Sequence, residues 1–297
     1  MSGDRQGRGG AHRADPRVII RDLSTLDDMR ACVRLQQATW GKDFTEKVPL
    51  SILKVGQRLG GVSAGAFLTD GSAEGELVGF VFGLTGLTPD GPAHWSDMLA
   101  VSPEYRGRGI GIRLKLFQRE RVLDLDVRTM FWTFDPLEVR NGRLNFRRLG
   151  GYSVEYVPDM YGASVSPLHL GLATDRLVVR WDLDSRRVAE ALSAESGGPV
   201  DLSEAVTAFD VTLDGQWPVP ADALRPMPPE GDYLIPVPSG IAALHAARPD
   251  LARRWRKVGR AALQEALREG GAVIDAIPGE SLSHYRVVPR RSIQEHP

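Results

Sequence analysis

The stretch LAVSPEYRGRGIGIRLKLFQRER, residues 99–121, decides the fold class of this chain. An apolar run ends at Pro103, an alternation of arginine and glycine follows, and a long amphipathic segment comes after it. Proline and repeated glycine interrupt regular structure, whereas the segments on either side carry regular apolar patterns. The stretch therefore predicts a strand, a glycine-rich turn and a helix, in that order.

The segment after the glycines, from Gly109 to about Val122, predicts an amphipathic helix. Apolar residues recur on one face at helical spacing, and cations lie opposite. The apolar residues are Ile110, Leu114 and Phe117, and the cations are Lys115 and Arg119. We expect the apolar face to pack on a sheet and the cations to lie on the side away from it.

A strand that ends in a glycine-rich turn before a helix is a general device for holding a phosphate. Spacing separates the motifs that use it. A Walker loop needs lysine and then serine or threonine after its last glycine, but Ile112 follows Gly111. A dinucleotide fingerprint needs G-x-G-x-x-G, whereas Gly107, Gly109 and Gly111 give G-x-G-x-G. What remains is Arg-x-x-Gly-x-Gly, beginning at Arg106.

The elements around this stretch predict a mixed α/β domain followed by a smaller α/β region. Apolar or alternating runs predict strands at 17–23, 62–69, 76–84, 93–101, 127–134, 152–157 and 175–181. Helical patterns predict helices at 24–39, 49–60, 109–122 and 138–149. After a proline-rich stretch at 217–231, a strand at 232–238, a helix pair broken at Pro249, and strands at 272–278 and 284–289 follow.

The string LAVSPEYRGRGIG, in this strand–turn–helix context, resembles the pyrophosphate-binding segment of the GNAT superfamily of N-acyltransferases. The resemblance covers about residues 17–183. A glycine turn that only caps a helix is the alternative, but it does not explain three glycines together with Arg106. The resemblance implies a mixed, mainly antiparallel sheet flanked by helices, with an appended α/β region at 184–297. We expect residues 1–16 to be a disordered tail.

The resemblance also implies a site between two diverging strands, 93–101 and 127–134. The pantetheine arm of acetyl-CoA or another acyl-CoA, succinyl-CoA among them, would enter this gap and pair with the main chain. The Leu99 N–H would polarise the thioester carbonyl and stabilise the oxyanion. An amine would attack directly, and no metal is expected. The implied CoA-binding residues are Leu99, Ala100, Val101, Arg106, Gly107, Arg108, Gly109, Ile110, Gly111 and Asn141.

Asp97 is the candidate base that takes a proton from the attacking ammonium, directly or through water. It lies two residues before Leu99, so strand alternation predicts that both share a face, with His94 on the opposite face. Two alternatives are a carboxylate exposed to solvent at a strand edge and an anchor for the substrate ammonium.

The helix predicted at 138–149 departs from the family pattern. Phe146 stands where the family commonly has a tyrosine that protonates the departing thiolate. Either the thiolate leaves without a general acid or another group serves, and Tyr152 and Tyr156 are the nearby candidates. Asn141 and Asn145 are the amides available to contact CoA on this helix.

The sequence says little about the acceptor. Asp135, at the end of a predicted strand, could cap the next helix or bind substrate, and Arg176 could pair with a substrate carboxylate or form a surface ion pair. The chain is most similar to a bacterial subgroup of long GNAT proteins, some of which serve amino-acid N-acylation. This implies transfer of an acetyl or succinyl group to a small-molecule primary amine, with an amino acid as one option. A non-catalytic acyl-CoA sensor is the alternative.

Composition and charge argue against several other classes of protein, namely nucleic-acid-binding, membrane-binding and membrane-spanning proteins. The formal net charge of −1 gives no global attraction to nucleic acid or to an anionic membrane. We interpret the basic side chains of the helix at 253–260 as a face exposed to solvent. For the C-terminal region that contains this helix, we expect a role as a wall over the acceptor pocket or as a homodimer contact. The single cysteine, Cys32, and the lack of an apolar signal segment indicate a cytoplasmic protein. No apolar run approaches the roughly 20 residues of a membrane span.

Overall fold

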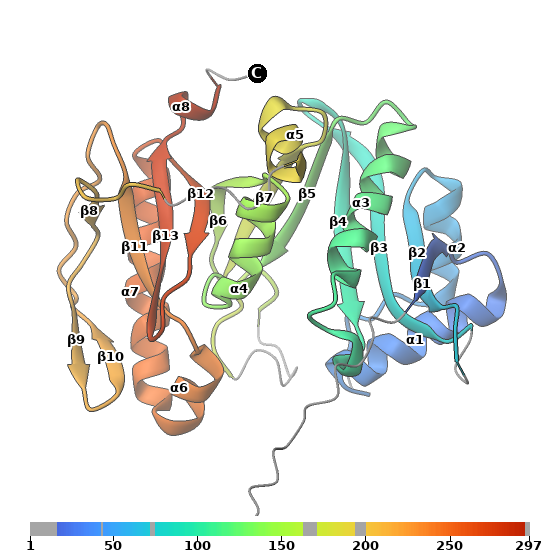
Figure 1. Ribbon diagram of the computed structural model, residues 1–297, viewed down its shortest axis with the longest axis horizontal. Helices are drawn as coiled ribbons and strands as arrows, with labels where there is room; N and C mark the ends of the chain where they lie inside the picture. Colours follow the sequence, from blue (N-terminus) through green and yellow to red (C-terminus); the bar gives the residue numbers. More distant parts are fainter. Residues whose placement is uncertain (1–16, 43, 72–74, 163–170, 194–199, 295–297) are drawn as a thin grey trace, which may run out of the picture.

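The computed structural model describes residues 17–42, 44–71, 75–162, 171–193 and 200–294 (Figure 1). The tail expected at residues 1–16 lies outside the described residues. The strands are β1 (Val18–Asp22), β2 (Val62–Leu68), β3 (Leu77–Thr88), β4 (Gly91–Val101), β5 (Thr129–Phe134), β6 (Tyr152–Val157), β7 (Arg176–Asp182), β8 (Val206–Thr207), β9 (Val211–Asp214), β10 (Trp217–Pro220), β11 (Tyr233–Pro238), β12 (Gly271–Ile277) and β13 (Leu282–Pro289). The helices are α1 (Leu26–Trp40), α2 (Leu50–Arg58), α3 (Ile110–Leu123), α4 (Val139–Gly142), α5 (Arg186–Ser193), α6 (Ile241–Ala247), α7 (Pro249–Arg268) and α8 (Arg291–Gln294), with a 3₁₀ turn η1 (Pro103–Tyr105) and a π-helical turn η2 (Arg143–Arg148).

One mixed sheet runs through the molecule in the order β1-β2-β3-β4-β5-β7-β6-β12-β13-β11-β8. Only the pairs β4–β5 and β11–β8 are parallel, and the other neighbours in this sheet run antiparallel. The mainly antiparallel α/β architecture expected from the sequence is therefore confirmed. The crossover from β4 to β5 is made by α3, which is the helix that follows the glycine-rich turn.

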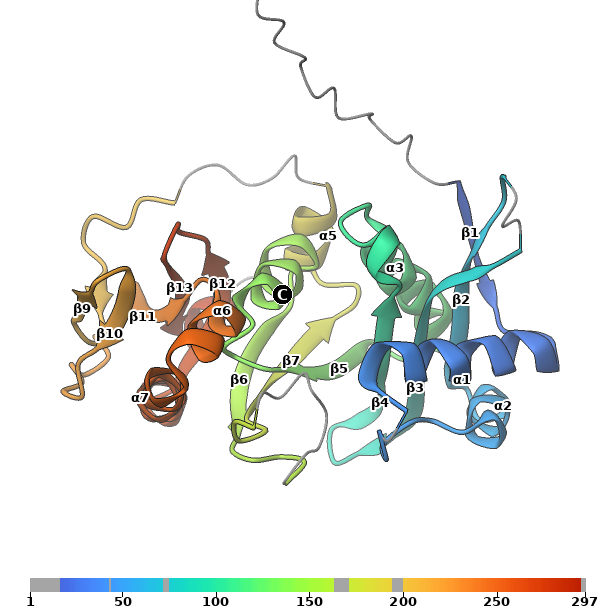
Figure 2. The same ribbon diagram turned by 90° about the horizontal axis from the view of Figure 1, so that it is seen from below.

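Helices cover both faces of the sheet. Figure 2 shows α3 and α5 on one face and α1, α2 and α7 on the other. A large buried cluster extends from β1 and β2 under α3 to the C-terminal strands, and a second cluster lies beneath α1. The division expected at residue 183 stays a prediction, and strands from both sides of it share one sheet and one core.

The position of α1 follows from its N-terminus. Thr25 and Asp28 form a reciprocal capping box, which satisfies two backbone N–H groups at the start of the helix. Asp28 also accepts two hydrogen bonds from Arg21 of β1, at 2.8 and 3.0 Å, so the helix start is tied to the sheet edge.

Three segments differ from the sequence prediction. The helix expected at 138–149 is a short α4 followed by the π turn η2, and this wider turn keeps Phe146 and Leu149 in the core. The proline-rich stretch contains β10, which pairs with β9 as a separate hairpin. Residues 186–193, which have little apolar content, form α5 with Val188 buried. No helix in the described ranges combines the length and apolar character that membrane crossing requires.

Candidate active site

The strands β4 and β5 pair over two positions only. His94 faces Met130 and Trp95 faces Phe131, and no further pair joins these strands among the described residues. Beyond that point β4 continues with β3 to Val101, while β5 continues with β7. The strands therefore diverge, and the backbone of the C-terminal half of β4 is open on one side. An extended ligand can pair with such an edge as an added strand.

A β-bulge in β4 changes which side chains share a face. The register passes from Phe82–Met98 to Gly83–Ser96, so Asp97 is the extra residue. The expectation that Asp97 shares a face with Leu99 is therefore wrong, whereas His94 does lie on the face opposite Asp97. The His94 ring lies 3.0 Å from the amide of Gln118 on α3, and the Leu99 side chain lies beside the start of the same helix.

Asp97 lies on the other side of the sheet, with Trp95 and Glu46. Desolvation by the surrounding protein and the negative charge of Glu46 raise the pKa of the Asp97 carboxyl, whereas a hydrogen bond from the Trp95 side chain lowers it. The side chain remains accessible to solvent. A carboxylate with a raised pKa is a better proton acceptor near neutral pH. Glu46 was not predicted as a site residue, since it lies in a loop without a recognisable motif.

His94 is a poor candidate for this role. Its ring contacts the Thr85 hydroxyl at 2.9 Å and the Gln118 amide at 3.0 Å, and it is fully buried. Burial and, to a smaller extent, the charge of Lys115 lower the pKa of His94 to about 3. The imidazole is therefore neutral and already hydrogen-bonded.

The turn between β4 and α3 has the geometry of an anion cradle. Gly107 and Gly109 have φ values of +77° and +74°, which favour glycine, and Gly109 is the N-cap of α3. The first N–H groups of α3 have no acceptor within the helix and carry its positive dipole end. The exposed Arg106 folds back so that Nε donates to the Val101 carbonyl at 3.0 Å. These residues fit a pyrophosphate at the open end of the gap.

The candidate acids lie away from this gap. Tyr152 donates to Asp182 at 2.9 Å, at the end of the sheet where Asp182 faces the first residue of β5. Burial, followed by the charge of Asp182, raises the pKa of Tyr152 to about 12. Tyr156 donates to Asp175 at 2.5 Å, and burial with this hydrogen bond raises its pKa well above the usual value. The structure does not bring Tyr152 together with Leu99, and its catalytic role stays a prediction.

Phe146, which stands where the family commonly has a tyrosine, is part of the hydrophobic core. Phe146 is buried and packs edge-on against Phe134 and Tyr285. Asn145 is buried on the same turn, whereas Asn141 is exposed on α4. Contact between Asn141 and CoA therefore stays a prediction.

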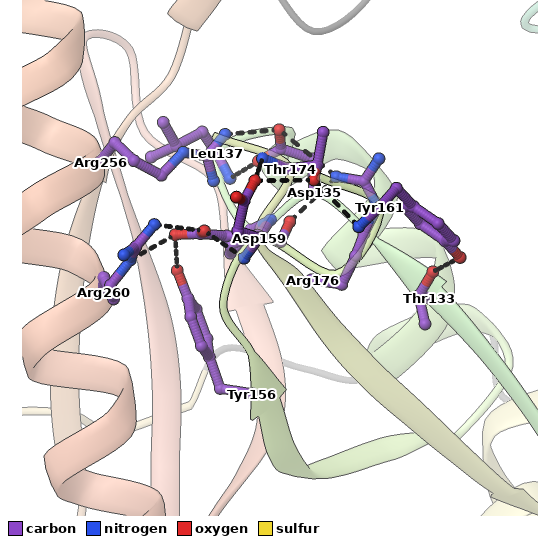
Figure 3. A network of polar contacts seen from close by, with 12 residues as sticks. Thr133, Asp135, Leu137, Tyr156, Asp159, Tyr161, Thr174, Arg176, Arg256 and Arg260 are labelled. Carbon is purple, nitrogen blue, oxygen red and sulfur yellow. Dashed lines mark hydrogen bonds and ion pairs between the residues drawn. The ribbon is translucent and has the colours of Figure 1, made fainter. Parts of the chain in front are cut away.

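A polar network joins the C-terminal region to the end of β5 (Figure 3). Asp135 accepts from the Leu137 N–H at 2.8 Å and from Arg256 of α7 at 2.6 Å. Arg260 of α7 donates twice to Asp175, at 2.9 and 2.5 Å. The expectation that the basic helix is a solvated face is thus wrong for Arg256, which is buried.

Arg176 lies in the same network. Its Nη1 is 3.9 Å from Asp135, and its guanidinium lies 5.2 Å from the ring centre of Tyr161. Tyr161 in turn shares a hydrogen bond of 3.2 Å with Thr133 of β5. Asp135 therefore makes a turn contact just before α4 and does not cap that helix, whose N-cap is Glu138. Arg176 pairs with Asp135 in a buried position and not at the surface.

Lys115 is a residue whose position the sequence did not predict correctly. It was expected on the side of α3 away from the sheet, but it is buried between α3 and the sheet. Its Nζ donates to Ser96 Oγ at 2.7 Å and lies 3.8 Å from the ring centre of Trp132. Burial lowers the pKa of Lys115 well below its usual value.

Comparison with known proteins agrees with this geometry. The model of the acetyltransferase (GNAT) family matches residues 30–141, which include β4, the glycine-rich turn and α3. No curated protein matches the sequence.

Among solved structures, YncA of Salmonella typhimurium, solved with its cofactor acetyl-CoA, is 18% identical, with 57% of this chain and 96% of that chain covered and a TM-score of 0.45. NAA60 of Arabidopsis thaliana, in complex with acetyl-CoA, is 16% identical, with 56% and 99% covered and a TM-score of 0.45. A GNAT-family acetyltransferase of Streptococcus pneumoniae is 16% identical, with 55% and 98% covered and a TM-score of 0.42. The sequence match and the strand–turn–helix geometry together lead to one conclusion: the chain contains a domain of the GNAT acetyltransferase family, matched over residues 30–141.

Proposed function

We propose that this protein is an acyl-CoA-dependent N-acyltransferase that moves an acetyl or succinyl group to a primary amine of a small molecule, with an amino acid as a candidate acceptor. The observation that carries the proposal is the divergence of β4 from β5 beside the turn from Arg106 to Gly111. The open edge of β4 suits a pantetheine arm, and the turn suits its pyrophosphate. The membership of this segment in the GNAT family supports the same assignment.

CoA supplies the acyl group as an activated thioester. The backbone of Leu99 and Val101 aligns the arm, and the Leu99 N–H donates to the thioester carbonyl oxygen as negative charge develops there. This alignment also brings the carbonyl carbon within reach of the acceptor amine, which lowers the entropic part of the barrier. We assign no covalent intermediate to the protein.

Asp97 takes the proton that the attacking ammonium must lose. Its carboxylate lies on the α1 side of the sheet, whereas the CoA-binding turn leads into α3 on the other side, so the two substrates approach the gap from opposite faces. The new C–N bond forms as the C–S bond breaks, and the departing thiolate takes a proton from solvent. No protein acid is required, because a thiolate is a weak base.

Release of free thiol tests this proposal. Acetyl-CoA and succinyl-CoA are each offered with a panel of D- and L-amino acids, polyamines and peptides. Thiol release with one acceptor class identifies donor and acceptor together. Asp97→Asn should lower kcat by about 100-fold or more, the range for loss of a general base, while CoA affinity is retained.

The second candidate is a non-catalytic acyl-CoA sensor. It is favoured by the replacement of the usual tyrosine with Phe146, a buried core residue. Tight CoA binding without thiol release across the panel would support this candidate. Under it, Asp97→Asn would change neither turnover nor affinity.

A further inference from the structure

A buried lysine lies where the two diverging strands meet. Ser96 and Trp132 are the first residues beyond the last paired positions of β4 and β5. Lys115 bridges them from α3, with Nζ 2.7 Å from the Ser96 hydroxyl and 3.8 Å from the centre of the Trp132 ring. Its ammonium group is therefore at the apex of the gap.

This amine has no counter-ion in the part of the chain that the structure describes. No ion pair within those residues joins Lys115 to a carboxylate, and its only described polar partner is a neutral hydroxyl. An isolated buried ammonium is costly and is normally paired with an anion. A methionine or leucine would fill the same space without this cost. An anionic ligand that reaches the apex would supply the missing charge.

The proposed function puts the acyl group in that direction, and the inference rests on it. With the pyrophosphate at the turn 106–111 and the pantetheine running along Val101 to Leu99, the acyl chain continues toward Ser96. Leu99 and Ser96 are separated by about 8 Å of bulged strand. An extended four-carbon diacid acyl group spans about 5 Å, and a charge-assisted hydrogen bond adds about 2.8 Å.

We propose that Lys115 selects CoA thioesters whose acyl group ends in a carboxylate, by pairing with that carboxylate at the apex of the gap. The donor class is then a short dicarboxylic acyl-CoA of about four carbons. Ser96 acts as a positioning residue that holds the ammonium when the ligand is absent. The ring of Trp132 stabilises the cation through its π face.

Binding calorimetry with two CoA thioesters tests this inference. Succinyl-CoA and butyryl-CoA have the same number of acyl carbons and differ by a terminal carboxylate or methyl group. The wild type should bind succinyl-CoA on the order of 30-fold more tightly or better, the scale of a buried charge pair. Lys115→Met keeps the length and removes the charge, so this preference should disappear.

Arg121→Met is the matched control, because Arg121 is an exposed cation on the same helix that pairs with Asp22 away from the gap. It should keep the wild-type preference. Equal affinity of the wild type for the two thioesters would overturn the inference, and this result does not depend on the folding of any variant. An unchanged preference of Lys115→Met for succinyl-CoA over butyryl-CoA would also overturn the inference.

The two proposals fail differently. Equal affinities together with acyl transfer would overturn only the role of Lys115. A strong preference for succinyl-CoA without acyl transfer to any acceptor would support the role of Lys115 and point to the sensor. A protein that binds no CoA thioester would overturn the proposed function and, with it, this inference.

Discussion

The ion pair between Asp135 and Arg256 leads to an asymmetric prediction about stability. The Arg256 side chain is 6% exposed, and that of Asp135 is 19% exposed. Nε and Nη1 of Arg256 have no hydrogen-bond partner among the described residues. Asp135, in contrast, also accepts from the Leu137 N–H and has Arg176 at 3.9 Å. Removal of Asp135 therefore leaves a buried cation with unpaired N–H groups, whereas removal of Arg256 leaves a carboxylate that keeps other partners.

Asp135→Asn keeps an acceptor for Leu137 but removes the carboxylate with which the buried Arg256 guanidinium forms its described ion pair. We expect the free energy of unfolding to fall by about 3–5 kcal/mol, the range for breaking a buried ion pair. Arg256→Met keeps the apolar stem and removes N–H groups whose unpaired burial costs about 1–3 kcal/mol each. Because Asp135 keeps other partners, this variant should lose only about 1–2 kcal/mol. The double variant should be no less stable than Arg256→Met alone.

Urea unfolding followed by tryptophan fluorescence measures the four free energies of this cycle. Arg254→Met is the control on the same helix, because Arg254 pairs with Asp222 at the surface. It should change stability by about 0–1 kcal/mol. The reasoning is refuted if Arg256→Met costs as much as Asp135→Asn, or if the two losses simply add.

Three further predictions concern the site and the strand beside it. Gly83→Ala should destabilise the protein by about 1–3 kcal/mol, because a Cβ there would lie 2.3 Å from His94 Nε2; unchanged urea unfolding would contradict this packing. Tyr152→Phe should leave kcat within about twofold, and a loss of about 100-fold or more would instead identify Tyr152 as the general acid. Activity should fall as the pH decreases through the raised pKa of Asp97. Glu46→Gln removes the negative charge that raises this pKa, so the acidic limb of the pH profile of kcat should move to lower pH; an acidic limb that does not move would exclude electrostatic coupling between Glu46 and Asp97.

Most of the N-terminal fold could be predicted from the sequence, because its local signals agree with its packing. The first three helices begin close to the positions predicted for them: Thr25 caps α1, Pro49 precedes α2, and the glycine-rich turn precedes α3. The proline-rich stretch was harder to interpret, since prolines are compatible with the two-stranded β9–β10 hairpin outside the main sheet. The π turn could not be predicted, because it depends on packing around Phe146 from strands distant in sequence.

The candidate site was predictable only where one motif determines it. The turn from Arg106 to Gly111 is such a motif, and the structure gives it the expected place. The faces of β4 were predicted wrongly because strand alternation fails at a bulge, and Asp97 is the bulged residue. Lys115 was misplaced because a cation on an amphipathic helix normally faces water. Arg256 reaches β5 through a tertiary contact for which the sequence carries no local signal.

Binding of acetyl-CoA to the wild type and to Arg106→Glu, measured by calorimetry, tests the central claim most directly. The claim is that the turn from Arg106 to Gly111 holds the pyrophosphate while β4 holds the arm. We predict saturable binding to the wild type, a loss on the order of 100-fold in Arg106→Glu from reversal of a phosphate-facing charge, and no loss in the surface control Arg121→Glu. Equal affinity of the wild type and Arg106→Glu would contradict the account.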